Sequence, residues 1–150
     1  MQVKDVMTRD VETAGADSPI AAIAKTMESH DIGLLPVCDG SRVVGMLSDR
    51  DITIRALANN LHPEQLRCRD IMTPHVVFCF EDHDLDEARK LMQEHKIRRL
   101  PVLNRQRNLV GIVALSDIAL GSGDSKSSGI ALQEVSIPDA PKPLPGQKRE

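Results

Sequence analysis

Two aspartates stand at equivalent places in two similar stretches of this sequence, each just inside a predicted helix start. Asp51 closes the string Ser48-Asp-Arg-Asp51, and Asp117 closes Ala114-Leu-Ser-Asp117. A serine followed three residues later by an acid is a capping box, in which each side chain accepts a hydrogen bond from the other residue's backbone N–H. The same geometry suits ligand binding. Free N–H groups at a helix start attract phosphate, and a carboxylate has lone pairs for both hydroxyls of a ribose.

Other residues that could do chemistry give weaker signals. Cys79 and His83 could both bind zinc, but no second pair accompanies them, so we expect no metal site. His30 and His95 end predicted helices, where a cation interacts favourably with the helix dipole. The sequence contains no phosphate-binding glycine loop, no HExxH and no nucleophile elbow. We therefore expect the protein not to be an enzyme.

These candidates recur because the chain repeats itself. Residues 5–37 match residues 70–102 at a constant offset of 65, with twelve identical pairs. The second copy then has one extra residue, and the match resumes at offset 66 with Gly45 and Gly111. A repeat of this length is one structural unit that needs its twin to bury its apolar face. Two units predict a pseudo-twofold body with a ligand cleft between them.

Each copy predicts the order strand, helix, strand, strand, helix. Ser18 before Pro19 predicts a helix N-cap, Asp84 with Glu87 predicts a capping box, and Asp39-Gly40 predicts a tight turn between strands. In the first copy these elements are expected at 18–30, 34–38, 42–47 and 49–58. In the second copy they are expected at 76–80, 84–95, 100–103, 109–113 and from 115 onward.

Composition restricts the class of protein. At 150 residues the chain suits one domain or two half-domains that share a core. A net charge of -3 offers no basic field for nucleic acid or anionic lipid, and the absence of Trp and Tyr leaves no stacking platform for bases. No apolar run approaches the roughly 20 residues of a membrane span. The N-terminus has no signal-peptide pattern, and three cysteines without paired spacing fit a reducing compartment, so we expect a cytoplasmic protein.

The chain divides into a first copy at 1–58, a connector at 59–69, a second copy at 70–120 and a tail at 121–150. The tail is rich in Gly and Ser and then in Pro, a composition typical of a solvated, disordered segment. A polyproline ligand at 141–145 for a groove on a partner is the alternative.

Three strings in each copy resemble the CBS domain, the module named after cystathionine β-synthase. The strings in the first copy are Asp5-Val-Met-Thr8, Ile32-Gly-Leu-Leu-Pro-Val37 and Gly45-Met-Leu-Ser-Asp-Arg-Asp51. Those in the second are Asp70-Ile-Met-Thr73, Ile97-Arg-Arg-Leu-Pro-Val102 and Gly111-Ile-Val-Ala-Leu-Ser-Asp117. The resemblance covers about residues 1–120. It implies an α/β (α+β) CBS-domain pair, or Bateman module, of two β-α-β-β-α repeats related by a pseudo-twofold axis and packed through their sheets.

The resemblance also implies two clefts, each built from both copies, in which the aspartate holds a ribose. Cleft A would combine Ser48, Arg50, Asp51, Thr73, His75, Val76, Arg98 and Arg99. Cleft B would combine Thr8, Val11, Gly33, Leu34, Ser116 and Asp117. Arg98 and Arg99 would contact phosphate, which guanidinium groups bind well, although they could equally be a solvated strand start. Because cleft B has Gly33-Leu34 in place of these arginines and Ala114 in place of Ser48, we expect cleft A to be the better nucleotide site.

The function implied is that of the small stand-alone two-CBS proteins of bacteria, which the chain resembles. Such a module would bind AMP, ADP, ATP or S-adenosylmethionine between its repeats, with no further cofactor. It would signal to a protein partner or to the second chain of a homodimer. The alternative is a ligand-independent dimeric scaffold of the stress-response type. DNA binding fits poorly with the charge and the composition.

Overall fold

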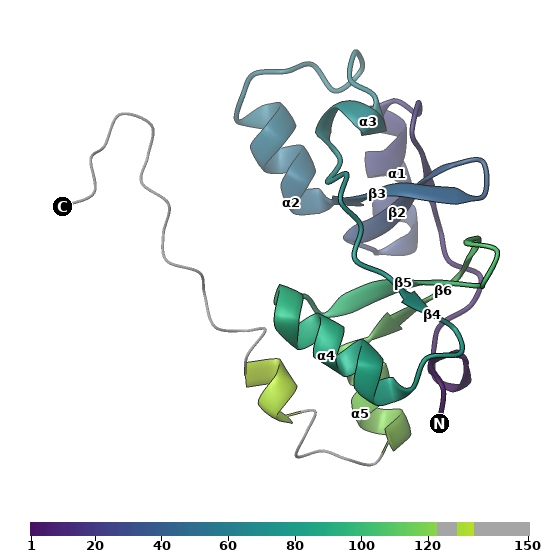
Figure 1. Ribbon diagram of the computed structural model, residues 1–150. Coiled ribbons are helices and arrows are strands. Elements are labelled where there is room, and N and C mark those ends of the chain that lie inside the picture. Colours follow the sequence, from purple (N-terminus) through teal and green to yellow (C-terminus); the bar gives the residue numbers. More distant parts are fainter. Residues whose placement is uncertain (123–128, 134–150) are drawn as a thin grey trace.

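The computed structural model describes residues 1–122 and 129–133 (Figure 1). It has the predicted α/β fold, in which each half of the chain forms one three-stranded sheet with helices against it. The elements in chain order are the 3-10 helix η1 (Val3–Asp5), β1 (Ala14–Gly15), α1 (Ile20–His30), β2 (Leu34–Asp39), β3 (Arg42–Ser48), α2 (Asp49–Asp51), the π-helix η2 (Ile52–Leu57), α3 (Cys68–Ile71), β4 (Cys79–Phe80), α4 (Leu85–His95), β5 (Arg99–Leu103), β6 (Leu109–Ala114) and α5 (Leu115–Ser122).

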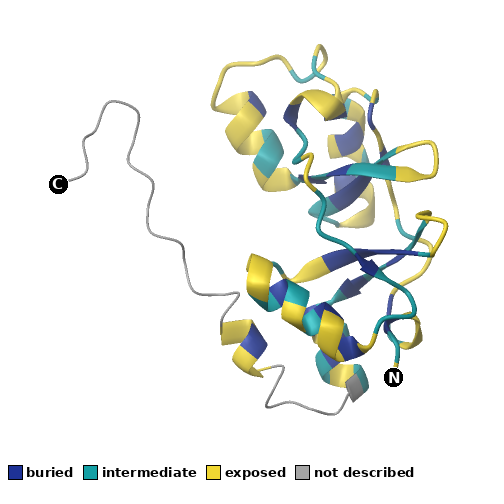
Figure 2. Ribbon diagram, in the orientation of Figure 1, coloured by how far each residue is buried: buried dark blue, intermediate teal, exposed yellow. Residues whose placement is uncertain are grey.

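The two sheets have the same topology, as the repeat predicts. Their strand orders are β1-β2-β3 and β4-β5-β6, with the first pair of each parallel and the second antiparallel. Buried residues concentrate in the strands and on the inner sides of the helices (Figure 2). The strand expected at 76–80 is reduced to Cys79–Phe80. The reason is that Val76 and Phe78 line a cavity with Arg42 and Val43 of the other half instead of pairing in the sheet.

The two repeats exchange their first segments. Val3 and Met7 are buried in the core of the second half, and Cys68 and Ile71 are buried in the core of the first. Backbone hydrogen bonds hold both exchanged segments. Thr8 and β6 residue Ile112 bond in both directions at 2.8 and 3.0 Å, as do Thr73 and β3 residue Met46. Each core therefore contains residues from both copies of the sequence repeat.

Gly45 and Gly111, which match in the two copies, stand where the exchanged segments cross the sheets. A Cβ atom at Gly45 would lie 2.9 Å from the carbonyl oxygen of Thr73, and one at Gly111 would lie 2.7 Å from that of Thr8. Both distances are shorter than real Cβ contacts. Glycine is required here because the backbones approach closely.

Two predicted helix starts differ from those in the structure, and the exchange of segments is the reason. Pro19, not Ser18, is the N-cap of α1, and Asp84 caps α4 with no side-chain hydrogen bond, so no capping box forms with Glu87. Instead the first N–H group of each helix donates to an exchanged segment. Ile20 donates to the carbonyl of Leu66, and Leu85 donates to that of Met1. Because backbone carbonyls already satisfy these groups, the side chains are not needed as caps.

The second helices of the two repeats differ. The helix expected at 49–58 is α2 followed by the π-helix η2, in which the bond from Ala58 N to Thr53 O spans one residue more than in an α-helix. Its counterpart α5 is an ordinary α-helix.

One short stretch of the tail, which we expect to be mostly disordered, is described by the structure. Residues 129–133 are helical, and Ala131 is fully buried in the core of the second half. The Pro-rich segment 141–145 lies outside the described residues. Among the helices that are described, none has both the length and the hydrophobicity of a membrane span.

Candidate functional site

One cavity gathers every residue predicted for cleft B. It has a volume of about 860 Å³, within the range of small-molecule sites. The cleft B residues that line it are Thr8, Val11, Gly33, Leu34, Ser116 and Asp117. Both repeats contribute. Gly33 and Leu34 lie at the start of β2, whereas Ala114, Ser116 and Asp117 lie at the end of β6 and the start of α5, beside Thr8, which is bonded to β6. This matches the arrangement expected for a ligand held between the two halves.

Asp117 stands at the edge of this cavity with part of its carboxylate uncommitted. Its Oδ2 accepts a hydrogen bond of 2.8 Å from the backbone N–H of Ala114. Ala114 has no hydroxyl to return the bond, so only half of a capping box forms. No hydrogen bond to Oδ1 is found among the described residues. Asp117 can therefore accept hydrogen bonds from a ligand in the cavity.

Asp51 has the full capping box that the sequence predicts. Ser48 N donates to Asp51 Oδ2 at 2.9 Å, and Asp51 N donates to Ser48 Oγ at 3.0 Å. The second oxygen, Oδ1, lies 3.7 Å from the guanidinium of Arg55, which also donates to the carbonyl of Ile71 at 2.8 Å. The Asp51 side chain is only 19% exposed. A ribose at Asp51 would have to compete with Arg55.

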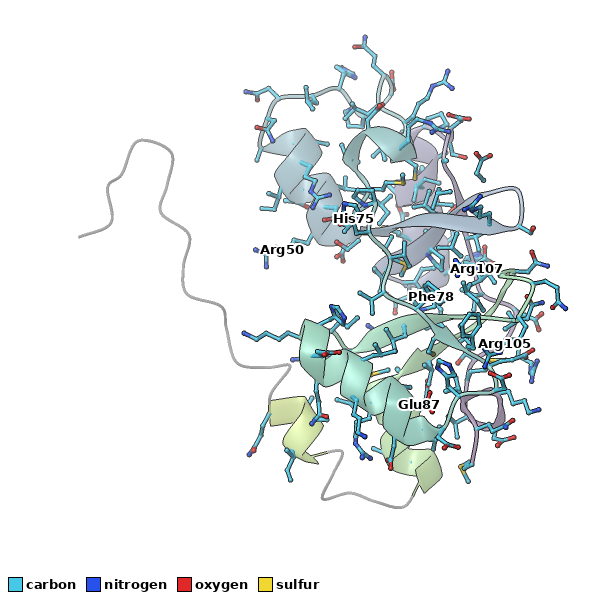
Figure 3. The ribbon with its side chains drawn as sticks, viewed as in Figure 1. Arg50, His75, Phe78, Glu87, Arg105 and Arg107 are labelled. Atoms are coloured by element: carbon cyan, nitrogen blue, oxygen red, sulfur yellow. The ribbon has the colours of Figure 1, made fainter. Side chains whose placement is uncertain are left out.

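None of three cavities in the described part of the chain gathers the predicted cleft A residues. Ser48 and Arg99 line the cleft B cavity, and Val76 lines one of about 190 Å³ with Phe78. Arg98 and Arg99 line a third cavity, of about 460 Å³, between α5 and residues 129–132. None of the three is lined by Arg50, Asp51, Thr73 or His75. Arg50 extends away from the ribbon near the start of α2, and His75 lies on the segment that passes between the halves (Figure 3).

Four acidic residues that line cleft B were not predicted. Asp10, Glu12, Asp31 and Asp49 add carboxylates to its wall. Asp10 and Glu12 flank the predicted Val11, and Asp31 lies two residues before Gly33. Scanning the neighbours of each predicted contact for charge would have found them.

The possible metal ligands do not form a site. Cys79 is fully buried, and burial raises the pKa of its thiol to about 12. His83 packs edge-on against Phe80 with the ring centres 5.3 Å apart. The guanidinium of Arg105 lies over the Phe80 ring, 4.2 Å from its centre. In the described part of the chain, no three His, Cys, Asp or Glu side chains are placed to hold a metal ion.

Comparison with known proteins identifies the family. The CBS domain family model matches residues 3–57 and 68–121. The CBS domain-containing protein YhcV of Bacillus subtilis is 39% identical over 134 residues, which cover 89% of this chain and 94% of that protein. Hypoxic response protein 1 of Mycobacterium tuberculosis is 38% identical over 117 residues, covering 77% of this chain and 81% of that protein.

Solved structures agree with the fold. The crystal structure of Hypoxic Response Protein I, with two coordinated zinc ions, superposes with a TM-score of 0.74 at 36% identity, covering 81% of this chain and 98% of that one. The CBS domain pair of protein MJ0100, in complex with 5-methylthioadenosine and S-adenosyl-L-methionine, has a TM-score of 0.71 at 32% identity, covering 84% and 98%. With its two matched repeats and a cavity between them, this chain belongs to the CBS domain family.

Proposed function

We propose that this protein is a regulatory, non-catalytic cytoplasmic module that binds an adenosyl compound between its two repeats. The observation that carries the proposal is the cavity of about 860 Å³ lined by all six residues predicted for cleft B, with the Asp117 carboxylate at its edge. The class of ligand is supported by the similar MJ0100 domain pair, which is complexed with 5-methylthioadenosine and S-adenosylmethionine. Val11, Leu34 and Ile112 supply an apolar wall for an adenine ring.

A ligand in this cavity would act on the relative position of the two halves. It contacts Leu34 of the first half on one side, and Asp117 together with Thr8, which is bonded to β6, on the other. Its affinity therefore depends on how the halves are oriented. A ligand shifts such an equilibrium only by its difference in affinity between orientations. At a free concentration 100 times its dissociation constant it would stabilise the bound form by about 2.7 kcal/mol.

The signal would pass to a second copy of the chain or to another protein through the second helices. Ile54 on η2 and Leu120 on α5 are exposed apolar residues at matching places in the two repeats. Single exposed apolar residues are common, but here two occupy matching positions of the repeat. We include a homodimer in the proposal for this reason.

A thermal-shift series tests the binding. AMP, ADP, ATP and S-adenosylmethionine are each added to the wild type, to Asp117→Ala and to the control Asp86→Ala, which removes an exposed aspartate at the start of α4. At least one compound should raise the melting temperature of the wild type and the control, but not that of Asp117→Ala. An equal shift in all three proteins would contradict the role of Asp117.

The absence of Trp and Tyr provides an independent test. The pure protein absorbs very little at 280 nm, so a strong band near 260 nm in a native preparation would reveal a bound adenine. Mass spectrometry after denaturation distinguishes a nucleotide from contaminating nucleic acid.

The second candidate is a scaffold that needs no ligand. It is favoured by Asp51, whose two carboxylate oxygens already have partners in the protein. This candidate predicts no thermal shift with any adenosyl compound, together with an intact oligomer.

A further inference from the structure

The wall of the cleft B cavity is strongly acidic. Five carboxylates line it, and Arg99 is the only basic residue among the described residues that do so. The acids are Asp10, Glu12, Asp31, Asp49 and Asp117. The wall therefore has a formal excess of four negative charges, in a chain whose net charge is only -3. A concave wall of one sign concentrates its field inside the cavity.

Local backbone structure holds these acids at the wall. Asp10 and Asp31 have φ values of 56° and 50°, a left-handed conformation that Asp and Asn tolerate better than most residues. Asp49 N donates to the carbonyl of Gly33 at 2.9 Å, and a Cβ atom at Gly33 would lie 2.9 Å from Asp49 Oδ2. The glycine thus leaves room for the Asp49 carboxylate against the backbone.

The negative charge of the cleft B wall is specific to this cleft and is not a feature that both repeats share. At the positions that match Asp10, Glu12, Asp31 and Asp49, the other repeat, on the cleft A side, has a neutral or basic residue; Asp117 alone of the five acids has an acidic counterpart, Asp51. The matched pairs are Asp10 and His75, Glu12 and Val77, Asp31 and Lys96, Gly33 and Arg98, and Asp49 and Leu115. The match is also structural, because Leu115 N donates to the carbonyl of Arg98 at 2.8 Å just as Asp49 N donates to that of Gly33.

We propose that the two clefts are tuned to opposite charge, and that cleft B takes an adenosyl compound with a positively charged substituent in place of phosphates. The proposal rests on the adenosyl-binding function above and specifies the ligand class of that site. A triphosphate would bring several negative charges toward five carboxylates, and repulsion in a partly enclosed site opposes this. A sulfonium or ammonium group on the ligand would be attracted by the same residues.

The test uses two probes that differ by one charge. S-adenosylmethionine and S-adenosylhomocysteine have the same skeleton, and only the former has a methylated, positively charged sulfur. Each is titrated, alongside ATP in the presence of EDTA, into full-length protein with labelled isoleucine methyl groups. Ile32 and Ile112 line cleft B, and Ile97, the repeat counterpart of Ile32, reports on cleft A.

The expected order of affinity at Ile32 and Ile112 is S-adenosylmethionine, then S-adenosylhomocysteine, then ATP. The difference between the first two should shrink as salt is added, because salt screens partly exposed charges. The double variant Asp10→Asn/Asp31→Asn keeps side-chain shape and tolerance of the left-handed backbone. It should weaken S-adenosylmethionine by roughly three- to tenfold, the size expected for two partly exposed charge interactions, and leave S-adenosylhomocysteine nearly unchanged.

The matched control is Glu28→Gln/Glu64→Gln, which removes the same net charge from exposed positions away from the cavity. It should leave all three affinities within twofold of the wild type. If ATP binds at Ile32 and Ile112 as tightly as S-adenosylmethionine, or if both double variants behave alike, the charge proposal is overturned while adenosyl binding stands. If none of the three compounds moves any of the three methyl signals, both the proposed function and this inference are overturned.

Discussion

At the scale of single residues, Asp51 and Asp117 occupy matching positions but have different surroundings. Asp51 accepts from Ser48 and lies near Arg55, which ties η2 to the exchanged helix α3 through the carbonyl of Ile71. Asp117 accepts a single hydrogen bond, from Ala114. In the folded protein both carboxylate oxygens of Asp51 have partners within the chain, whereas Asp117 lines the cavity. The expected preference of nucleotides for cleft A remains a prediction, and the cavity of about 860 Å³ lies at cleft B.

This difference leads to a first prediction, about stability. Asp51→Ala should lower the free energy of unfolding by about 1–2 kcal/mol, since it removes a helix cap and an ion pair. Asp51→Asn keeps an acceptor for Ser48 N and should lose less. Urea unfolding followed by circular dichroism at 222 nm measures both, because the chain has no Trp for fluorescence. An Asp51→Ala protein as stable as the wild type would show that the capping box is not needed.

The buried thiols give a second prediction, about pH. Burial raises the pKa of Cys68 to about 11 and that of Cys79 to about 12, from an ordinary value of 9.0. In the unfolded chain these thiols ionise near pH 9, whereas in the folded protein they stay protonated. Their contribution to stability is therefore complete below pH 9 and is lost as the pH rises toward 11 to 12.

Urea midpoints at pH 8, 9, 10 and 10.5, under reducing conditions, measure this loss. The variant Cys68→Ala/Cys79→Ala is the control. It should be less stable at pH 8 because it leaves cavities, but its stability should fall less steeply above pH 9. Equal slopes for the two proteins would mean that other groups cause the alkaline loss.

At the scale of elements, the exchange of first segments explains both what the sequence predicts well and what it does not. The strands at 34–38 and 42–47 and their tight turn follow from local apolar patterns and are confirmed as β2 and β3. The cap expected at Ser18 and the capping box expected between Asp84 and Glu87 are wrong, although Asp84 is the N-cap of α4. Carbonyl groups of Leu66 and Met1, distant along the chain, accept from the first N–H groups of these helices. Local patterns contain no information about such long-range partners.

The candidate site, too, could be predicted from the sequence only in part. Motif resemblance placed Thr8, Gly33 and Asp117 in one cleft, and the structure brings them to one cavity. It did not find the acids Asp10 and Asp31, because these stand in connecting segments beside the motifs and contribute charge, which the motifs do not encode.

The close approach of the exchanged segment at Thr8 to Gly111 of β6 gives a third prediction. Gly111→Ala should destabilise the protein by roughly 1–3 kcal/mol, the usual cost of overpacking, because the new methyl group would meet the Thr8 carbonyl and Met7. The control is Gly40→Asn, at a turn with φ of 64° and no atom within 4 Å of a new Cβ, a conformation that Asn accepts. This control should remain close to the wild type in urea unfolding. If Gly111→Ala is equally stable, the close approach of the two backbones is wrong.

At the scale of the whole molecule, the exchange makes the two halves interdependent. Arg69 of α3 donates to Asp17 at 2.7 Å, which lowers the pKa of Asp17 and adds a polar contact to the buried residues of the exchanged segment. Each core includes side chains that the other repeat supplies, so one half cannot move without shifting segments in the other. A ligand between the halves can therefore affect surfaces far from its cavity.

Ile54 on η2 and Leu120 on α5, through which we propose that the signal passes, are apolar residues that are 52% and 86% exposed. These residues match at the repeat offset of 66, so the pseudo-twofold relation places one on the second helix of each half. Isolated exposed apolar residues are common, but two at matching positions of a repeat indicate a surface with a shared role. A symmetric dimer would bury both.

The fourth prediction follows from this surface. The wild type should sediment with twice its chain mass of 16.5 kDa, and Ile54→Glu/Leu120→Glu should sediment with the mass of one chain, because buried charges without partners oppose association. Its folded circular dichroism spectrum should persist, as both residues are exposed in the single chain. Ala24→Glu, at an exposed position on α1, is the control and should keep the wild-type mass. If the double variant still sediments as a dimer, the interface does not include Ile54 and Leu120. If the wild type sediments as a monomer, the homodimer is wrong and the module must act on a different protein.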